Sequence, residues 1–478
     1  MTKYGLLIPG AAAAAGVAQV YAPYDRSILA EVEAGDESHV ETALSNASAL
    51  FADKDGWLPL HQRIAILERA AKLMSEQHEE LSMGAAREGG KPLIDSRIEV
   101  TRAIDGLNLC IEVVRTDHGS VIPMGTTAAG AGRVAFTQRQ PIGVVVAVSA
   151  FNHPLNLIVH QVASAVAAGC PIIVKPADDT PLSCIEFVRI LHQAGLPPEW
   201  CQVLIASSVA VAQALVTDPR VAFFTFIGSA RVGWMLRSKL APGTRCALEH
   251  GGAAPLVLAA DAPLRRAIPA IAKGGFYHAG QVCVSVQRVF AHESIARKFA
   301  TALAEQANEL IIGDQTNEAT QVGPLIRPAE VDRIHAWVTE AMVSGAERLS
   351  GGDPISDSCY PCTVLYQPPR DAKVSTQEIF GPVVCVYEYK DLRDAFDQAN
   401  ELPFAFQAAV FTDSIEIAHQ AYRHLDASAV MVNDHTAFRV DGMPFAGLKQ
   451  SGLGVGGIPY TVHDMTIEKM LVMYSPGQ

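Results

Sequence analysis

The apolar positions in the first quarter of the chain recur at helical spacing. Residues 36–50 and 59–83 carry apolar side chains three to four positions apart, and residues 95–115 repeat the pattern. Such spacing places the apolar side chains on one face of a helix. Two strand-like runs over residues 17–33, separated by the turn Pro23-Tyr24-Asp25, precede these segments. The N-terminal region is therefore expected to form short strands followed by a layer of helices.

Residues 119–140 depart from this pattern. They are rich in Gly, Ala and Thr, and only the run from Arg133 to Gln138 alternates between polar and apolar side chains. Alternation of this kind is typical of a strand with one exposed face. We expect the segment to form an arm outside the core.

From residue 142 onward, short apolar runs alternate with helical segments. Residues 142–148 and 172–176 are rich in β-branched side chains, which is typical of strands buried on both faces. Residues 155–169 between them have helical spacing, and the same alternation continues to the apolar run at 221–228. This order predicts a parallel sheet with crossover helices, the doubly wound architecture that binds nucleotides. A second α/β segment is expected from about residue 252 to 450.

Composition limits the classes of partner. A chain of 478 residues suits two or three domains. The formal net charge of −13, without a block of basic residues, argues against nucleic acid or an anionic membrane as partner. An uninterrupted apolar stretch of about 18 residues is lacking, so we expect no membrane span. The apolar N-terminal stretch GLLIPGAAAAAGVA is interpreted as a strand and loop of the mature fold rather than a signal peptide.

The nine cysteines are odd in number and lack the spacing of a disulfide framework. Free thiols in a reducing compartment explain them most simply, and a cytoplasmic location is expected. Cys359 and Cys362 form a single CxxC pair without a second pair or a histidine cluster nearby. A zinc site normally needs four ligands, so no metal site is expected.

Cys283 is the strongest candidate nucleophile. It lies in the segment GGFYHAGQVCVSVQR at residues 274–288, whose glycines let backbone N–H groups approach a bound ligand. Arg288, five residues later, could add positive charge that favours the thiolate. Taken alone, the cysteine is more simply interpreted as a small buried hydrophobic residue.

Two further residues follow predicted strands and suit catalysis. Asn152 comes after the strand at 142–148, where its amide N–H could stabilise an oxyanion, although an asparagine there also suits a helix cap. Glu249, beside two glycines, could act as a general base, or it could be a surface acid at a strand end.

Other residues at strand ends suit a dinucleotide. Lys175 and Asp178 follow the strand at 172–175 and could bind ribose hydroxyls, since ligands sit at the carboxyl ends of parallel strands. Gly228, Ser229 and Gly233 open the helix after the strand at 221–227, a position that suits a pyrophosphate. A solvated lysine and glycines needed only for turn geometry are the simpler alternatives.

Six motifs in the same order make the chain resemble the aldehyde dehydrogenase superfamily, almost from end to end. They are FNHP at 151–154, KPAD at 175–178, GSARVG at 228–233, EHGGAAP with GQVC at 249–255 and 280–283, EIFGPV at 378–383, and MPFAGLKQSG at 443–452. The resemblance implies a Rossmann-like cofactor domain over 1–118 and 142–251 and a catalytic domain over 252–455. It also implies a small β oligomerisation arm at 119–141 and a tail at 456–478, which pair across subunits in a homodimer or homotetramer.

The resemblance also implies residue roles. Cys283 matches the nucleophile, Asn152 the oxyanion amide and Glu249 the general base. The matches to cofactor contacts are Lys175 for the adenosine ribose, Ser229 for the pyrophosphate, and Glu378 with Phe380 for the nicotinamide ribose. The implied reaction is NAD(P)-dependent oxidation of an aldehyde to its acid through a thiohemiacetal and a thioester, which Glu249-activated water hydrolyses.

Several positions depart from the usual family pattern. Asp178 stands where relatives that prefer NAD commonly have Glu, so we favour NAD and leave NADP open. The segments VCVSVQR and NDHTAFRVDGMPFAG resemble a branch that includes lactaldehyde and phosphonoacetaldehyde dehydrogenases. Arg102 is the one cation we name for an anionic substrate, and His153 and His160 are further candidate substrate residues.

Three alternatives to hydrolytic aldehyde oxidation are considered. A CoA-acylating semialdehyde dehydrogenase is disfavoured because acylating relatives generally lack a glutamate at the position of Glu249. A catalytically silent binding relative is disfavoured because the thiol, amide and carboxylate are all present. A thioesterase would show turnover without cofactor.

Overall fold

The sheet of the first α/β unit has the strand order β20-β10-β9-β6-β7-β8 in the computed structural model, which describes residues 2–475. Five strands are parallel, and β20 adds to the β10 edge in the antiparallel sense. The strands are β6 (Val144–Val148), β7 (Ile172–Lys175), β8 (Cys201–Val203), β9 (Val221–Ile227), β10 (Arg245–Glu249) and β20 (Gly452–Leu453). The strand order reverses between β6 and β9, which is the switch point where such sheets bind ligands.

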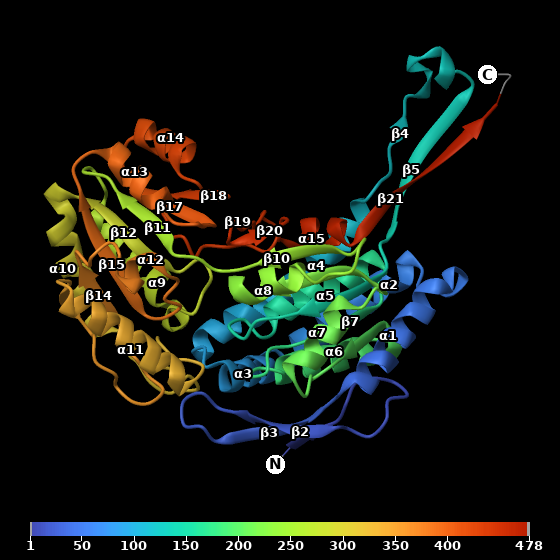
Figure 1. Ribbon diagram of the computed structural model, residues 1–478, viewed down its shortest axis with the longest axis horizontal. Coiled ribbons are helices and arrows are strands. Elements are labelled where there is room, and N and C mark those ends of the chain that lie inside the picture. The colour runs from blue at the N-terminus through green and yellow to red at the C-terminus, as the bar shows by residue number, and fades with distance from the viewer. Residues whose placement is uncertain (1, 476–478) are drawn as a thin grey trace.

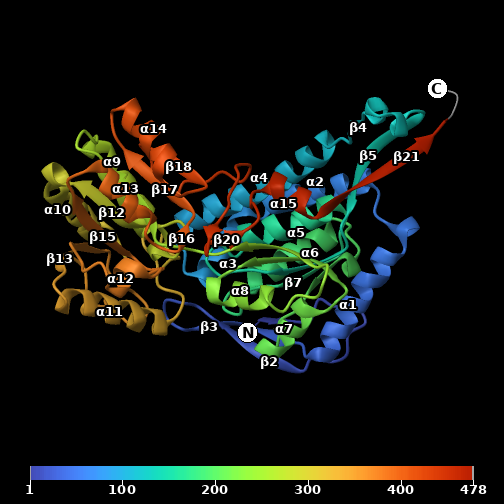
Figure 2. The same cartoon turned by 45° about the horizontal axis from the view of Figure 1, so that its top comes forward.

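Helices cover both faces of this sheet, as its buried strands require (Figures 1 and 2). Val145 and Ala147 of β6 pack against one group of helices, and Val144 and Val146 pack against the other. The first group is α2 (Leu60–Glu76), α4 (Leu93–Thr116), α5 (Asn156–Ala168), α6 (Leu182–Gln193) and α15 (Ile458–Asp464). The second group is α1 (Glu37–Ala52), α7 (Val209–Thr217) and α8 (Ala230–Arg237).

The apolar spacing over 59–83 covers two helices rather than one. The chain leaves the helical conformation at Gln77, between α2 and α3 (His78–Gly89). Gln77 ends α2, and its carbonyl then accepts a hydrogen bond from the N–H of Leu81 in α3. Apolar side chains continue into the same core on both sides of the break, so their spacing does not reveal it.

The second α/β unit contains a seven-stranded sheet with the order β13-β14-β15-β12-β11-β17-β18. Its strands are β11 (Ala254–Leu258), β12 (Val286–His292), β13 (Glu347–Ser350), β14 (Thr363–Tyr366), β15 (Val383–Tyr389), β17 (Gln407–Phe411) and β18 (Ala429–Val432). All pairs are parallel except β13 with β14. The helices are α9 (Leu264–Phe276), α10 (Glu293–Glu309), α11 (Pro328–Val343), α12 (Lys373–Thr376), α13 (Leu392–Asn400) and α14 (Ile415–His424).

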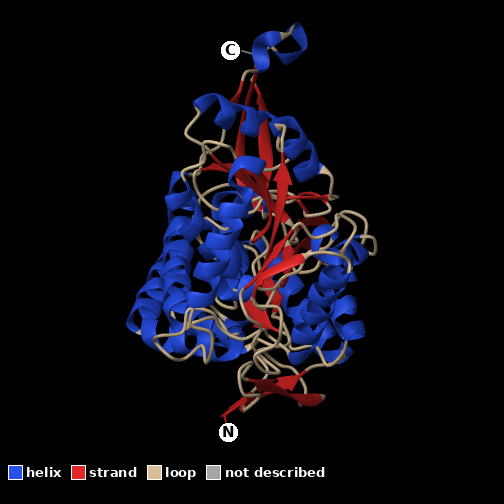
Figure 3. Ribbon diagram, turned by 90° about the vertical axis from the view of Figure 1, so that its left-hand side faces the viewer, coloured by secondary structure: helices blue, strands red, loops and turns tan. Residues whose placement is uncertain are grey.

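A narrow three-stranded sheet projects from the first unit, and the C-terminal strand ends at its tip (Figures 1 and 3). It consists of β4 (Val121–Ile122), β5 (Arg133–Pro141) and β21 (Thr466–Tyr474), with β5 in the centre. Residues 119–141 and the last strand thus form a projecting arm. The range 456–478 is not a uniform tail, because α15 inside it packs against α4 and α5.

Small sheets complete the fold. β1 (Thr2–Tyr4), β2 (Gly16–Tyr21) and β3 (Ile28–Ala34) form a layer at the opposite end from the arm, and β16 (Phe404–Ala405) pairs with β19 (Leu448–Lys449). Within residues 2–475, we find no helix with the length and apolar character that crossing a membrane requires.

Candidate active site

A cavity of about 850 Å³ lies at the carboxyl ends of the central strands of the first sheet and is closed by loops of the second unit. Its lining includes Cys283, Asn152 and Glu249, which come from three distant parts of the sequence. It also includes all but one of the residues expected to bind the cofactor: Lys175, Asp178, Gly228, Ser229, Glu378 and Phe380.

Cys283 lies on the loop between the 3-10 turn Tyr277–Gly280 and strand β12. Gly280 has a φ of +67°, and a Cβ at this position would overlap with the carbonyl oxygen of Gly381, so the loop needs glycine here. Burial raises the pKa of the Cys283 thiol to about 12, and the positive charge of Arg439 opposes that rise. Without ligand, the thiol is therefore protonated at neutral pH.

The side chain of Asn152 is fixed against the loop that carries Cys283. Its Nδ2 donates a hydrogen bond of 2.9 Å to the carbonyl oxygen of Gln281. The Gln281 side chain is itself held, because its Oε1 accepts from the N–H of Ile326 at 2.9 Å. An amide has two N–H donors, so Asn152 can keep one for a substrate oxygen while the other maintains its orientation.

Glu249 ends strand β10, and its carboxylate lies close to the backbone of Gly456. A Cβ at Gly456 would overlap with Oε1 of Glu249, so the carboxylate has room only beside glycine. Burial raises the pKa of Glu249, and Arg439 again opposes the rise. A carboxylate with a raised pKa accepts protons more readily, which suits a general base.

Other residues of the cavity lining fit a dinucleotide. Oε1 of Glu378 is buried and lacks a hydrogen-bond partner among residues 2–475, as a site for a ribose hydroxyl would require. Ser229 is the N-cap of α8, and the N–H groups at a helix start favour a pyrophosphate. Nζ of Lys175 forms a 2.5 Å ion pair with Asp178, whose side chain is 75% exposed. These residues would bind the two riboses and the pyrophosphate.

Phe380 adopts a left-handed conformation with a φ of +49°. Its ring meets that of Phe151 edge to face, with the centroids 5.8 Å apart. A strained backbone at a ligand site is retained only where the surroundings enforce it. Phe380 is thereby fixed in the wall of the cavity next to Glu378.

Three residues considered from the sequence do not line the cavity. Gly233 lies against His250, and a Cβ there would overlap with the imidazole, so this glycine serves packing. His160 is buried behind the wall and contacts Asp441. Arg288, which could have added positive charge near the thiol, instead donates its guanidinium hydrogen bonds to the carbonyl oxygens of Ala253 and Ala399 at 3.0 and 2.9 Å.

Arg102 and His153 do line the cavity. Nε2 of His153 lies 3.4 Å from the Tyr277 hydroxyl, and burial holds the pKa of His153 well below its usual range. Arg439, which we did not single out from the sequence, is a second arginine in the lining. The signal available in the sequence was its place in the segment FRVDG, two residues before an acid and close to the last motif.

Within residues 2–475, no group of three or more potential metal ligands is found.

Comparisons with known proteins agree along nearly the whole chain. Residues 11–471 match the family described as Aldehyde dehydrogenase family. The chain is 35% identical over 472 residues to a 3-sulfolactaldehyde dehydrogenase of Priestia aryabhattai, covering 98% of both chains. It is 33% identical to a lactaldehyde dehydrogenase of Methanocaldococcus jannaschii, covering 94% of this chain and 96% of that one.

Solved structures show the same fold. Aldehyde dehydrogenase 21 from Physcomitrella patens, in complex with the reaction product succinate, matches with a TM-score of 0.95 and 32% identity over 100% of this chain and 99% of that chain. A glyceraldehyde-3-phosphate dehydrogenase from Methanocaldococcus jannaschii, complexed with NADP, matches with a TM-score of 0.91 and 32% identity. The match covers 96% of this chain and 99% of that chain.

Proposed function

Because the chain belongs to the aldehyde dehydrogenase family, it catalyses NAD(P)-dependent aldehyde oxidation, and we propose that Cys283, Asn152 and Glu249 are its catalytic residues. The observation that carries this assignment is their position in one cavity, where thiol, amide and carboxylate come from separate segments. Nucleophile, oxyanion donor and base are the groups that covalent acyl chemistry needs.

The reaction begins when Sγ of Cys283 forms a bond to the aldehyde carbon. The thiol proton is released to solvent water, and the carbonyl oxygen becomes an oxyanion that accepts hydrogen bonds from Asn152 and the backbone N–H of Cys283. The bound nicotinamide supplies the acceptor for the hydride that leaves this carbon. Glu249 takes a proton from water, which attacks the resulting thioester. The C–S bond then breaks, the acid is released, and the proton on Glu249 passes to the leaving thiolate of Cys283.

We propose that water, not CoA, accepts the acyl group. Support comes from Glu249, a half-buried residue in the same cavity as Cys283, whose pKa is raised by desolvation. For the cofactor we propose a preference for NAD, because the Asp178 carboxylate would repel a 2′-phosphate. Lys175 offsets part of this charge, which leaves NADP as a weaker alternative.

The substrate is proposed to be a small aldehyde of the kind named for the two relatives, which are 3-sulfolactaldehyde and lactaldehyde dehydrogenases. These two compounds differ only in a sulfonate group. Arg102 and Arg439 in the cavity wall give a physical reason to include an anionic aldehyde among the candidates.

Absorbance of reduced nicotinamide tests these proposals. Purified protein would be mixed with lactaldehyde, 3-sulfolactaldehyde and neutral aliphatic aldehydes, with NAD or NADP, in the presence and absence of CoA. We expect turnover without CoA that is lost in Cys283→Ala. Strict dependence on CoA would refute the role given to Glu249, and cofactor binding without turnover of any aldehyde would favour a silent relative.

Assembly and location are also proposals. The arm strand β21 exposes apolar side chains along its length, which favours pairing with a second copy in a homodimer or homotetramer. Nine free cysteines favour a reducing compartment, in line with a cytoplasmic location.

A further inference from the structure

An ion pair between Asp179 and Arg327 joins the two α/β units at the edge of the cavity. Asp179 lies in the loop between β7 and α6, whereas Arg327 is the N-cap of α11 in the second unit. Nε of Arg327 donates to Oδ1 and Oδ2 of Asp179 at 2.9 and 3.0 Å, and Nη2 donates to Oδ2 as well. Both residues line the cavity, so the pair connects a wall from the first unit with a wall from the second.

This ion pair, which we call the rim ion pair, lies where the cavity meets solvent. The side chain of Arg327 is 50% exposed and that of Asp179 is 22% exposed. Lys175 and Asp178, the proposed contacts of a cofactor ribose, shortly precede Asp179 in the chain, and Asp178 is largely exposed as well. Asn152, by contrast, is buried. The part of the cavity around Lys175 and Asp178 therefore opens to solvent beside the rim ion pair.

Helix α11 continues the wall of the second unit from Arg327 into the cavity. Its side chains Glu330, Arg333 and Trp337 also line the cavity, at the spacing of one helix face. Nη2 of Arg333 donates to the carbonyl oxygen of Ile379 at 2.8 Å, one residue after Glu378. A shift of α11 away from the first unit would therefore widen the cavity along its length.

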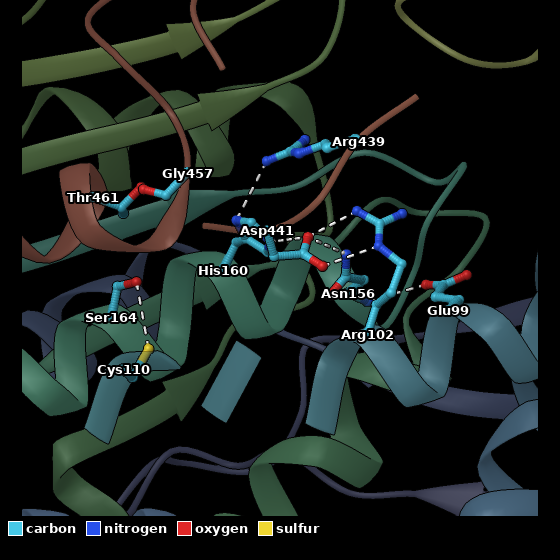
Figure 4. A network of polar contacts seen from close by, with 10 residues as sticks. All are labelled: Glu99, Arg102, Cys110, Asn156, His160, Ser164, Arg439, Asp441, Gly457 and Thr461. Carbon is cyan, nitrogen blue, oxygen red and sulfur yellow. Dashed lines mark hydrogen bonds and ion pairs between the residues drawn. The ribbon is translucent and has the colours of Figure 1, made fainter. Parts of the chain in front are cut away.

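A largely buried network holds the loop between β18 and β19 on the first unit (Figure 4). Arg102 donates to the two carboxylate oxygens of Asp441 at 2.9 and 2.7 Å, and Nε2 of His160 lies 2.7 Å from the same carboxylate. Nη2 of Arg439 lies 3.4 Å from Nδ1 of His160. A guanidinium can only donate, so Nδ1 accepts, the imidazole proton is on Nε2, and His160 is neutral. Charges shielded from water interact more strongly than exposed ones, so this connection resists opening more than the rim ion pair does.

Ion pairs that join the units elsewhere lie outside the cavity. Arg97 pairs with Glu318, and Lys273 pairs with Asp95, but none of these four residues lines the cavity. The rim ion pair differs because it connects walls between which a dinucleotide would bind. Partly exposed ion pairs are weak individually, so the rim ion pair can break and re-form readily.

We infer that the rim ion pair controls the passage of the dinucleotide into and out of its site. The pair is closed in the free and in the bound protein, and it opens each time the cofactor enters or leaves. Its permanent removal should therefore speed association and dissociation alike and leave the equilibrium affinity nearly unchanged. This inference rests on the proposed cofactor site, and it concerns the exchange of cofactor rather than the chemistry at Cys283.

The test removes both charges together, because Asp179→Asn with Arg327→Gln leaves the net charge at the rim unchanged. Stopped-flow fluorescence of NADH gives the association rate constant, and displacement by excess NAD gives the dissociation rate constant. We expect both rate constants to rise roughly two- to fivefold, with a Kd that changes less than about twofold. The reversed pair, Asp179→Arg with Arg327→Asp, should return both rate constants toward the wild-type values.

The matched control is Arg97→Gln with Glu318→Gln, which removes an ion pair between the units outside the cavity and should leave both rate constants unchanged. Equal acceleration in this control would overturn the inference, as would unchanged rate constants in the rim variant. Faster dissociation without faster association would also overturn it, because a direct contact between one of the side chains and the cofactor would explain that result. A wild-type protein that binds neither NADH nor NADPH would instead count against the proposed function.

Amide hydrogen exchange in the cofactor-free protein provides a readout that does not depend on binding. In the rim variant, residues 176–181 and the first turn of α11 should exchange faster than in the wild type, because the two walls separate more often. The control variant should match the wild type in these segments. Equal exchange in the rim variant and the wild type would contradict an ion pair that holds the walls together.

Discussion

The carboxylate of Glu249 can be tested separately from the thiol. Glu249→Gln keeps the size of the side chain but removes the base, so the thioester should form once and then accumulate. We expect a single burst of reduced cofactor per active site in stopped-flow absorbance, followed by a steady rate lowered roughly 100- to 10,000-fold. Cys283→Ala should show no burst. An unaltered steady rate in Glu249→Gln would assign the base to another group.

His160 should make stability depend on pH. Burial lowers the pKa of His160 to about 4, well below its unfolded value of 6.5. Between these values the unfolded chain binds more protons, so this contribution is complete above pH 6.5 and is lost as the pH falls toward 4. Urea unfolding at pH 7.5 and 4.5 should show a smaller drop in His160→Gln than in the wild type, by up to roughly 3 kcal/mol. Equal drops would contradict the neutral state assigned to His160.

Asp178 provides a test of cofactor choice. Its carboxylate is largely exposed and paired with Lys175, so removing it should leave the fold intact and free the lysine for a 2′-phosphate. We expect Asp178→Ser to raise kcat/KM for NADP roughly five- to tenfold, with little change in the KM for the aldehyde. The two cofactors would be compared at saturating aldehyde. An unchanged kcat/KM for NADP in this variant would show that residues other than Asp178 discriminate between the two cofactors.

At the scale of single residues, the sequence was informative where a residue type recurs in a motif. Cys283, Asn152 and Glu249 could be named from motifs, and the structure brings them to one cavity. It was uninformative where function depends on partners far away in the chain. Arg288 and Arg439 are the same residue type, yet the guanidinium of Arg288 donates to carbonyl oxygens, whereas Arg439 lines the cavity and its charge acts on Glu249 and Cys283.

At the scale of elements, two helices of the first unit begin at buried carboxylates that belong to other helices. Oε1 of Glu99, in α4, accepts the N–H groups of Leu155 and Asn156 at the start of α5, at 2.9 and 3.0 Å. Glu88, in α3, does the same for Leu182 and Ser183 at the start of α6, at 2.8 and 2.7 Å. Since α5 follows the loop of Asn152, its cap also helps to position the site.

Removal of Glu99 and removal of Glu88 should lower the free energy of unfolding by different amounts. Glu99 is ion-paired with Lys91, and both side chains are fully buried, whereas Glu88 caps its helix without an ion pair among residues 2–475. Glu99→Ala would leave a buried lysine unpaired and should cost about 3–5 kcal/mol of unfolding free energy. Glu88→Ala should cost about 1–2 kcal/mol, the range for a lost helix cap. Equal shifts in urea midpoint would show that Lys91 finds another partner.

Regular elements were predictable because their periodicity is local. The strand–helix alternation after residue 142 is present as expected, since buried parallel strands leave continuous β-branched runs. The break at Gln77 and the packing of α15 were not predictable, because both depend on what the chain meets in three dimensions.

At the scale of the whole molecule, the arm exposes a row of apolar side chains on strand β21. Leu471 and Met473 of β21 are each about half exposed, as are several neighbours on the same strand. If a second copy covers them, Leu471→Glu should lower the mass measured by light scattering after size exclusion. Lys469→Glu on the same strand is the matched control and should leave the mass unchanged. A monomeric wild type would refute the assembly we propose.

The first α/β unit is completed by residues that the ribosome adds only after the second unit. Strand β20 covers the edge of β10 and helix α15 fills the core beside α5, yet both come after the entire second unit. At about 5–20 residues per second, roughly 10 to 40 s of synthesis separate β10 from β20. During this time the nascent chain carries an open sheet edge, which is where strands of other chains can attach. Because this edge stays open until β20 has been made, we expect chaperones to bind the nascent chain during this time.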